Sequence, residues 1–305
     1  MTHRADIEPL HAPETDALLD IARDLVDRAR RAGADQAEAG VSESRSVEAS
    51  VREGALETVE RSESRDAGLR VIIGKRQAGV AFSDLSASGV DLAVERAIAM
   101  ARAAPDDPYC GLVDPDQLAR SAADIQTYAP VETDEAALEE RALALEAAAR
   151  AVSGVHDVAS AGASAGVSAS GFVTSTGFER ARRGSRCSLG AAAIAKGDAG
   201  MERDYDSHMA RRLDLLKGPE EIGRSAGERA VSRLGAEKVA TGKMPVIFDK
   251  RVSTTFLSSL LGAISGPAIA RGTSFLMDKV GEPVFAQGVD IIEDPLRDWS
   301  FGARA

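Results

Sequence analysis

Two neighbouring stretches decide the fold: "SVEASVREGALETVERSES" (residues 46–64) and "AGLRVIIGKRQAGVAFSD" (residues 67–84). Both alternate apolar with polar residues, and glycines separate the runs. A period of two residues predicts half-buried strands, and glycines between such runs predict tight turns. We therefore expect four or five antiparallel strands between Gln36 and Ser83.

Helical patterns flank this predicted meander. Apolar residues recur at three- and four-residue steps between residues 14 and 32, which predicts an amphipathic helix. A second apolar stripe runs to about Ala103, and either Ser86 or Ser88 is suited to cap that helix. Helix, meander and helix together predict an α+β unit over residues 13–104.

The rest of the chain is predicted to form further domains. Residues 105–132 contain several prolines and read as a linker. A second, mixed α/β domain is expected over residues 133–240, and residues 241–305 are expected to begin a C-terminal domain that is incomplete at its end. No internal repeat is visible in the residue pattern.

The second domain has its own expected elements. An Ala-, Leu- and Glu-rich helix is predicted over residues 133–151. Small residues alternate over residues 155–194, which indicates a hairpin or meander with turns near Gly177 and Gly184. The remaining expected elements are a helix from about Pro219 to Leu234 and a strand at "MPVIFDK" (residues 244–250).

The stretch "RVSTTFLSSLLGAISGPAIAR" (residues 251–271) is uncharged between its terminal arginines. Its length suits a membrane span, which takes about 20 residues. Its many Ser and Thr residues, with Gly262, Gly266 and Pro267, disfavour a span. The apolar residues recur at helical spacing, so we expect a buried helix of about four turns over residues 252–265.

Composition limits the function. A net charge of -11 disfavours binding to a nucleic-acid backbone, which requires a basic surface. The N-terminal residues lack an apolar stretch, so we expect a cytoplasmic protein that contacts neither nucleic acid nor membrane. Cys110 and Cys187 have no CxxC spacing and are expected to be buried thiols.

Two motifs suggest chemistry, and both have a simpler interpretation. "GASAG" (residues 162–166) matches the G-x-S-x-G of a nucleophile elbow, but the strand pattern continues past Ser164 where an elbow needs a helix. The acidic residues of "GDAGMERDYDS" (residues 197–207) suggest a cation site. A solvated charged turn with Tyr205 packed inward is the favoured interpretation. The four histidines have no metal-binding spacing.

Several segments together resemble one family, the TldD/PmbA proteins, and within it the PmbA (TldE) branch. They are "RAIAMARAAPDDPYCGL" (residues 96–112), "GDAGMERDYDSHMARRL" (197–213), "MPVIFDK" (244–250) and "LLGAISGPAIARGTSFLMDKVGEPV" (260–284). The resemblance extends over about residues 16–295. It implies a cytoplasmic two-subunit metallopeptidase for unfolded or short peptides, in a family also named modulator of DNA gyrase.

The resemblance also implies where metal chemistry belongs. In the TldD branch the matching helix carries an HExxxH zinc signature, and a cysteine ligand comes from the C-terminal region. The corresponding residues here are Ser258, Ser259 and Ala263, none of which is a zinc ligand. We therefore expect no catalytic residue and no zinc in this chain, and zinc in a TldD-like partner subunit. The expected contacts with substrate or partner are Glu202, Arg203, Asp204 and Tyr205.

Two other functions compete with a dependent peptidase subunit. One is a regulatory or binding protein of the gyrase or a toxin–antitoxin system that acts without proteolysis. The other, with least support, is a serine hydrolase that uses Ser164. Family members continue past the position of Ala305, so the C-terminal domain is expected to be incomplete here. The partners that the resemblance implies are peptide substrates and a zinc-bearing TldD-like homologue.

Overall fold

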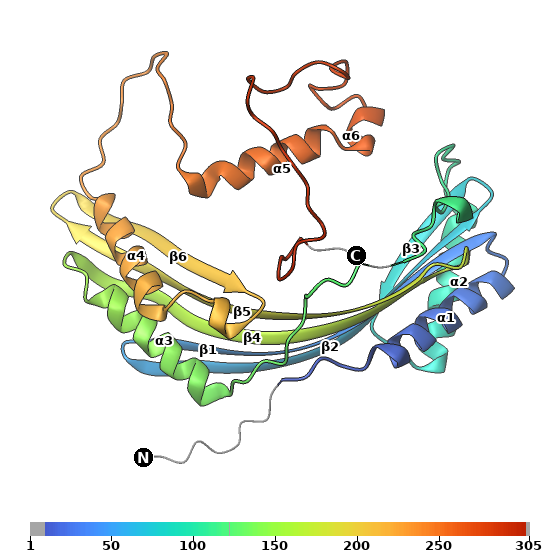
Figure 1. Cartoon of the computed structure of the whole chain (residues 1–305), viewed down its shortest axis with the longest axis horizontal. Coiled ribbons are helices and arrows are strands. Elements are labelled where there is room, and N and C mark those ends of the chain that lie inside the picture. The colour runs from blue at the N-terminus through green and yellow to red at the C-terminus, as the bar shows by residue number, and fades with distance from the viewer. Residues whose placement is uncertain (1–9, 122, 303–305) are drawn as a thin grey trace. The chain divides into compact units, whose positions relative to one another are not determined.

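The computed structural model describes residues 10–121 and 123–302 (Figure 1). The described residues divide into two compact units, of which one comprises residues 10–121, 123–236 and 294–302 and the other residues 237–293. The larger unit is an α+β fold built on one sheet, which confirms the predicted fold class.

The sheet has six antiparallel strands in the order β3-β2-β1-β4-β5-β6. The strands are β1 (Gln36–Arg52), β2 (Ala55–Ile73), β3 (Arg76–Phe82), β4 (Val155–Thr174), β5 (Glu179–Gly197) and β6 (Gly200–Ala210). Because β1 pairs with β4, for example at Ser44 and Ser168, the sheet is continuous across the predicted linker.

Four longer helices cover one face of this sheet (Figure 1). They are α1 (Thr15–Arg31), α2 (Ala87–Ala103), α3 (Glu135–Arg150) and α4 (Pro219–Ser232). The inward residues of α1 and α2 pack on β1 and β2 in one core cluster, and those of α3 and α4 pack on β4 and β5 in another. Ser86 caps α2 and Asp134 caps α3 through their side chains, so both helices begin near the predicted positions.

The predicted number of strands before α2 is wrong, because three long strands form where four or five were expected. Gly54 and Gly74 adopt positive φ and lie in turns, but Gly68 and Gly79 are paired inside strands. Gly184 was likewise expected in a turn and instead pairs with Ser168 within β5. A glycine in an alternating sequence therefore marked a turn only where the backbone takes the left-handed conformation.

The sheet contains an internal repeat that the sequence pattern did not reveal. Its halves have the same order of elements, α1-β1-β2-β3-α2 and α3-β4-β5-β6-α4. Leu18, Ala22 and Leu25 of α1 are buried, and Leu138, Ala142 and Leu145 are buried at the same spacing in α3. The two helices bury residues at the same spacing, but their exposed residues differ. A comparison of residue types therefore does not reveal the repeat.

The smaller unit departs from prediction. Residues 244–250 form no strand, and the expected buried helix is α5 (Ser253–Ala263), where Leu261 is 60% exposed. The other regular elements described in this unit are the short helices η3 (Lys250–Val252) and α6 (Gly266–Ala270). These elements offer no sheet edge for residues 244–250 to pair with and too little surface to cover α5.

Across the described ranges, no helix has both the length and the apolar character that crossing a membrane requires. Two short 3-10 helices complete the larger unit, η1 (Pro115–Gln117) in the predicted linker and η2 (Leu213–Leu215) before α4. Residues 294–302 belong to this unit, where the backbone of Trp299 donates a hydrogen bond to Gln126 and the Arg211 guanidinium lies 4.8 Å from the Phe301 ring centre.

Candidate functional site

The sheet face opposite the four helices has a floor of small residues. Valines and alanines of β1, β4 and β5 point into the helix-covered core, so the residues that alternate with them lie on the open face. These residues are Ser42, Ser44, Ser46 and Ser50 of β1, Gly162, Ser164, Gly166, Ser168 and Ser170 of β4, and Gly184, Ser188 and Gly190 of β5. Their short side chains leave the strand backbones close to the surface.

A cavity of about 380 Å³ lies on this face over β1, β4, β5 and β6. Ser164 and Ser188 meet at its floor, with their hydroxyl oxygens 2.7 Å apart. Glu48 and Arg186 also line it. The cavity therefore offers hydroxyl groups, a carboxylate that accepts hydrogen bonds and a guanidinium that donates them, all of which are suited to an extended polar chain.

Charge is distributed unevenly across the open face. Cross-strand pairing places Glu60 of β2 beside Glu48 of β1, whereas Arg182 and Arg186 lie on β5 beside small residues of β4. The face is thus acidic toward β2 and basic toward β5. A polypeptide bound across the strands would contact the acidic region at one end and the basic region at the other. Such an arrangement fixes the direction in which the polypeptide binds more than it increases the binding affinity.

Ser164 is not part of a nucleophile elbow. It lies within β4, pairs with Glu48 on one side and Ser188 on the other, and its hydroxyl contacts the Ser188 hydroxyl. The hydrogen-bond partner of its hydroxyl is thus another hydroxyl and not a base. The interpretation of "GASAG" as an accidental match is confirmed, since an elbow requires a strand-to-helix turn.

We expect a fluorophosphonate probe not to label this chain at Ser164, because an unactivated serine hydroxyl is a weak nucleophile. The measurement is intact-protein mass spectrometry after incubation with the probe. The Ser164→Ala variant is the control, since it retains every other hydroxyl of the face. A probe adduct on the natural chain that disappears in the variant would contradict this expectation.

The structure separates the four residues predicted to contact substrate or partner. Glu202 and Asp204 lie on the helix side of β6, where Asp204 is 6% exposed, whereas Arg203 and Tyr205 alternate with them on the open side. Tyr205 is 60% exposed, so the expectation that it packs inward is wrong. The segment is also a strand and not a turn, because its residues pair with β5.

Arg229 of α4 and Arg233, the residue that follows this helix, pair with acidic residues of β6. Arg229 lies 2.6 Å from Asp206, and Arg233 lies 3.3 Å from Glu202 and 3.6 Å from Asp204. Burial alone would raise the pKa of Asp206, but hydrogen bonds from Ser225 and Arg229 outweigh it and the net pKa is lowered. These carboxylates tie β6 to α4, and across residues 10–121 and 123–302 no cluster of three or more potential metal ligands occurs.

The predicted degenerate metal positions lie on α5. Ser258 and Ser259 are exposed, and the Ser259 hydroxyl donates a hydrogen bond to the Thr255 carbonyl at 2.9 Å. Ala263 is the buried residue of this helix. A neutral hydroxyl that bonds to its own helix and a methyl group do not fit zinc, which takes imidazole, thiolate or carboxylate ligands.

Both cysteines are free and buried, as expected from their spacing. Cys187 points into the core from β5, and burial raises the pKa of its thiol to about 11. Burial also raises the pKa of Cys110. Because the thiolate is the reactive form, both shifts lower the reactivity of these thiols at neutral pH.

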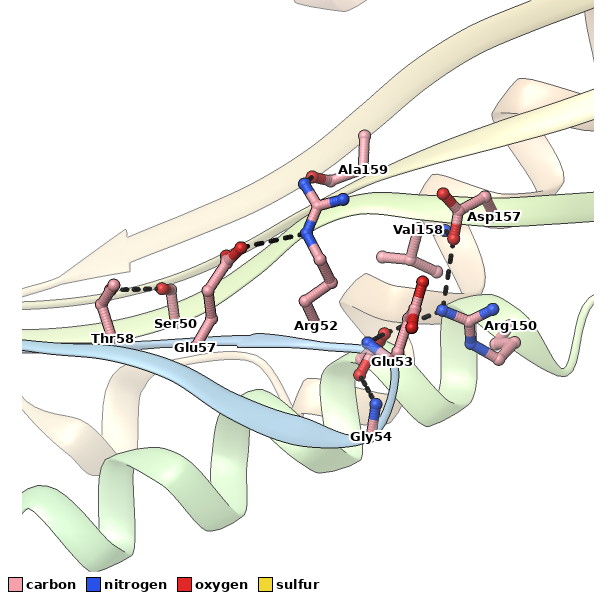
Figure 2. Close-up of polar contacts among 11 residues, drawn as sticks. Ser50, Arg52, Glu53, Gly54, Glu57, Thr58, Arg150, Asp157, Val158 and Ala159 are labelled. Carbon is pink, nitrogen blue, oxygen red and sulfur yellow. Dashed lines mark hydrogen bonds and ion pairs between the residues drawn. The ribbon is translucent and has the colours of Figure 1, made fainter.

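Sequence reasoning missed a buried carboxylate on α3. Glu146 is 2% exposed and accepts hydrogen bonds from the backbone N–H groups of Glu53, at 2.7 Å, and Gly54, at 2.9 Å, in the β1–β2 turn. Arg150 also contacts it at 2.9 Å. Figure 2 shows this turn beside Arg150 and Asp157. The sequence did contain a signal for this contact, because Glu146 is an acidic residue on the apolar stripe of α3.

Comparison with family models matches three regions to successive parts of one family. Residues 37–101 match PmbA/TldA metallopeptidase domain 1, residues 128–234 match the central domain, and residues 241–305 match the C-terminal domain. The chain belongs to the PmbA/TldD family. The resemblance drawn from the sequence is thereby confirmed.

Similar proteins carry related names. The metalloprotease PmbA homolog of Haemophilus influenzae is 34% identical over 88% of this chain and 60% of its own length, and metalloprotease PmbA of Escherichia coli O157:H7 is 31% identical over 86% and 58%. This PmbA/TldD chain thus spans about 60% of the length of these curated relatives.

Solved structures share the fold. A protein from Bacteroides thetaiotaomicron that is named as a modulator of DNA gyrase matches with a TM-score of 0.83 and 22% identity, over 95% of this chain and 67% of that one. TldE from Thermococcus kodakarensis matches with a TM-score of 0.64 and 21% identity, over 86% and 59%.

Proposed function

We propose that this chain is a subunit of a cytoplasmic zinc metallopeptidase of the TldD/TldE type that acts on unfolded or short peptides. The matches to three metallopeptidase domains support peptide hydrolysis as the activity of the assembly. The similarity to PmbA proteins supports the PmbA (TldE) branch. In this proposal a TldD-like homologue supplies the zinc and this chain depends on it.

The proposal that this chain depends on a zinc-bearing homologue rests on the residues of α5. At the positions where the catalytic branch has its zinc signature, this helix presents two serine hydroxyls and an alanine methyl group. None of them holds zinc or acts as a general base near neutral pH. No hydrolytic step is therefore assigned to this chain.

The open sheet face supports a role in holding substrate. An unfolded peptide presents backbone amides that need hydrogen-bond partners, and the serine floor with Glu48 and Arg186 offers both donors and acceptors. Arg203 and Tyr205 lie on the same side of β6 and are exposed. We assign these two residues to contact with peptide or partner, and Glu202 and Asp204 to holding β6 against α4.

Hydrolysis assays test the proposal directly. We expect a fluorescently labelled, unfolded casein to be cut by a mixture of this chain with a zinc-bearing TldD-like homologue, and not by this chain alone. A zinc chelator should abolish the activity, because the hydrolytic water must be activated by the metal. The measurement is the rate of fluorescence release for each chain separately and for the mixture.

Two results would contradict the proposal. Chelator-sensitive hydrolysis by this chain alone would show that it carries its own metal site. A stable complex with the homologue that hydrolyses nothing, under conditions where other TldD/TldE pairs are active, would favour the non-proteolytic alternative. Ser258→Ala serves as the control variant, since this exposed side chain is assigned no role in the chemistry.

A further inference from the structure

The outer edge of β2 is bare over most of its length. The short strand β3 pairs with β2 only from Ala67 to Ile73. The preceding part of β2, residues 55–66, therefore forms an edge of the sheet. Within residues 10–121 and 123–302, no segment makes backbone hydrogen bonds to the outer side of this stretch.

Strand geometry identifies the backbone groups that face outward. Ile73 and Arg76 flank a two-residue turn and so form a mutually hydrogen-bonded pair. Counting back by two along β2, every second residue directs its N–H and C=O groups to the same outer side. In the bare stretch these residues are Val59, Arg61, Glu63 and Arg65.

The two arginines of this set are held away from the edge by ion pairs. Charged side chains commonly protect an edge from pairing. Here Arg61 is held on the helix side by Glu135, and Arg65 by Glu43. Ser62 and Ser64 are the small residues on the open side. The stretch contains no proline, and the irregularity in β1–β2 pairing lies before Thr58, so nothing interrupts the edge beyond it.

The equivalent edge in the other half of the sheet already holds an extended segment. The backbone N–H of Ser185 in β5 donates to the Thr127 carbonyl at 3.2 Å, and the Thr127 hydroxyl donates to the Arg183 carbonyl at 2.7 Å. Since β2 and β5 both have 19 residues, Arg61 occupies in β2 the position of Ser185 in β5. The fold thus uses this position for pairing in one half and leaves it open in the other.

We propose that the β2 edge from Val59 to Arg65 binds an extended peptide by strand addition. The occupant is a peptide that carries basic side chains at alternate positions, because Glu60 and Asp66 flank the stretch on the open side. We take these peptides to be substrates of the peptidase assembly, and in this respect the inference rests on the proposed function.

A binding assay with this chain alone tests the inference. The probe is a fluorescein-labelled peptide of five Thr-Lys repeats, blocked at both ends, and the measurement is fluorescence anisotropy. The variants Glu63→Pro and Glu63→Ala lose the same carboxylate, but only proline removes the outward N–H and obstructs the edge. We expect Glu63→Ala to bind like the natural chain and Glu63→Pro to bind at least about tenfold more weakly.

Changes in the peptide keep the test decisive if Glu63→Pro does not fold. Peptides N-methylated on every Thr, or on every Lys, keep the charge but lose alternate backbone donors. We expect at least one of the two to lose binding to the natural chain. Three results would overturn the inference: both methylated peptides bind as tightly as the parent peptide, a folded Glu63→Pro variant binds as tightly as the natural chain, or the parent peptide does not bind.

The outcomes separate this inference from the proposed function. Binding by this chain alone, without hydrolysis in the mixture with a zinc-bearing homologue, would support the edge site and reject the peptidase assembly. Hydrolysis in the mixture with no binding at the edge would reject the edge site and leave the assembly intact.

Discussion

Glu146→Ala is expected to lower the free energy of unfolding of the larger unit by about 3 kcal/mol, since it removes a buried carboxylate that accepts two backbone hydrogen bonds and contacts Arg150. The donors belong to Glu53 and Gly54, whose φ angles of 53° and 77° give both central residues of the turn the left-handed conformation. That conformation is unfavourable for a non-glycine residue such as Glu53. The two hydrogen bonds to Glu146 offset this strain. Urea denaturation followed by circular dichroism measures the loss.

Three further substitutions separate the loss of packing from the loss of the hydrogen-bond acceptor. Glu146→Val places in α3 the residue type that α1 has at the equivalent buried position, Val26, so it retains packing but still loses the acceptor. We expect it to be less stable than the natural chain. Glu146→Gln retains one carbonyl acceptor and should be intermediate. Glu140→Ala, an exposed change on the same helix, is the control. A Glu146→Val variant as stable as the natural chain would show that the turn contact contributes nothing.

Acid should weaken the same contact. Burial raises the pKa of Glu146, but hydrogen bonds from Arg150 and from the turn lower it by a larger amount. The folded-state pKa therefore lies below the ordinary value. A carboxylate with a lowered folded-state pKa stabilises the fold fully above its unfolded pKa of about 4.3, and that stabilisation is lost as the pH falls through the folded value. The Glu146→Gln variant should therefore lose less stability than the natural chain between pH 6 and the acid transition.

Gly223→Val is expected to be still more disruptive, with a loss above about 3 kcal/mol or failure to fold. A Cβ atom at Gly223 would lie 2.2 Å from the Leu145 carbonyl oxygen and 3.0 Å from the Ala148 Cβ. Helices α3 and α4 therefore touch backbone to backbone at this point. The obstructing atom is a carbonyl of a helix and cannot rotate away, so the helices must separate.

Thermal unfolding measures this effect. Gly223→Ala should lose less stability than Gly223→Val but still more than Arg224→Ala, an exposed change next to it on α4. In an uncrowded helix interior, Gly to Ala would instead be stabilising by up to about 1 kcal/mol. A melting temperature of Gly223→Ala at or above that of the natural chain would mean that α3 and α4 are farther apart than described.

The sequence predicted helices better than strands for a physical reason. An apolar stripe with a period near 3.6 residues is a long signal, and α1 to α4 begin and end close to the predicted residues. Strand ends depend on turns, and Gly68 and Gly79 have the composition of turns without the backbone conformation. Residues 244–250 have the pattern of a strand, but pairing needs an available neighbour, which a local pattern does not reveal.

The candidate site was harder to predict. Ser258, Ser259 and Ala263 were found only through resemblance to a family, because serine and alanine carry no metal-binding signal of their own. The open face escaped notice, since alternating serines look like the solvated side of any strand. The paired acids of β6 could not be distinguished from a cation site until the arginines of α4, distant in sequence, were placed beside them.

The central pairing of β1 with β4 constrains the order of folding. Each half of the sheet contains contacts among neighbouring segments, whereas β1 and β4 meet across a separation of more than 100 residues, as between Ser44 and Ser168. Closing so long a loop is entropically unfavourable, so the halves are expected to form first and to dock late. Until docking, β1 and β4 each present a long unpaired edge of similar geometry. Two molecules that exchange halves would satisfy both edges, which makes a domain-swapped dimer the expected product of refolding at high protein concentration.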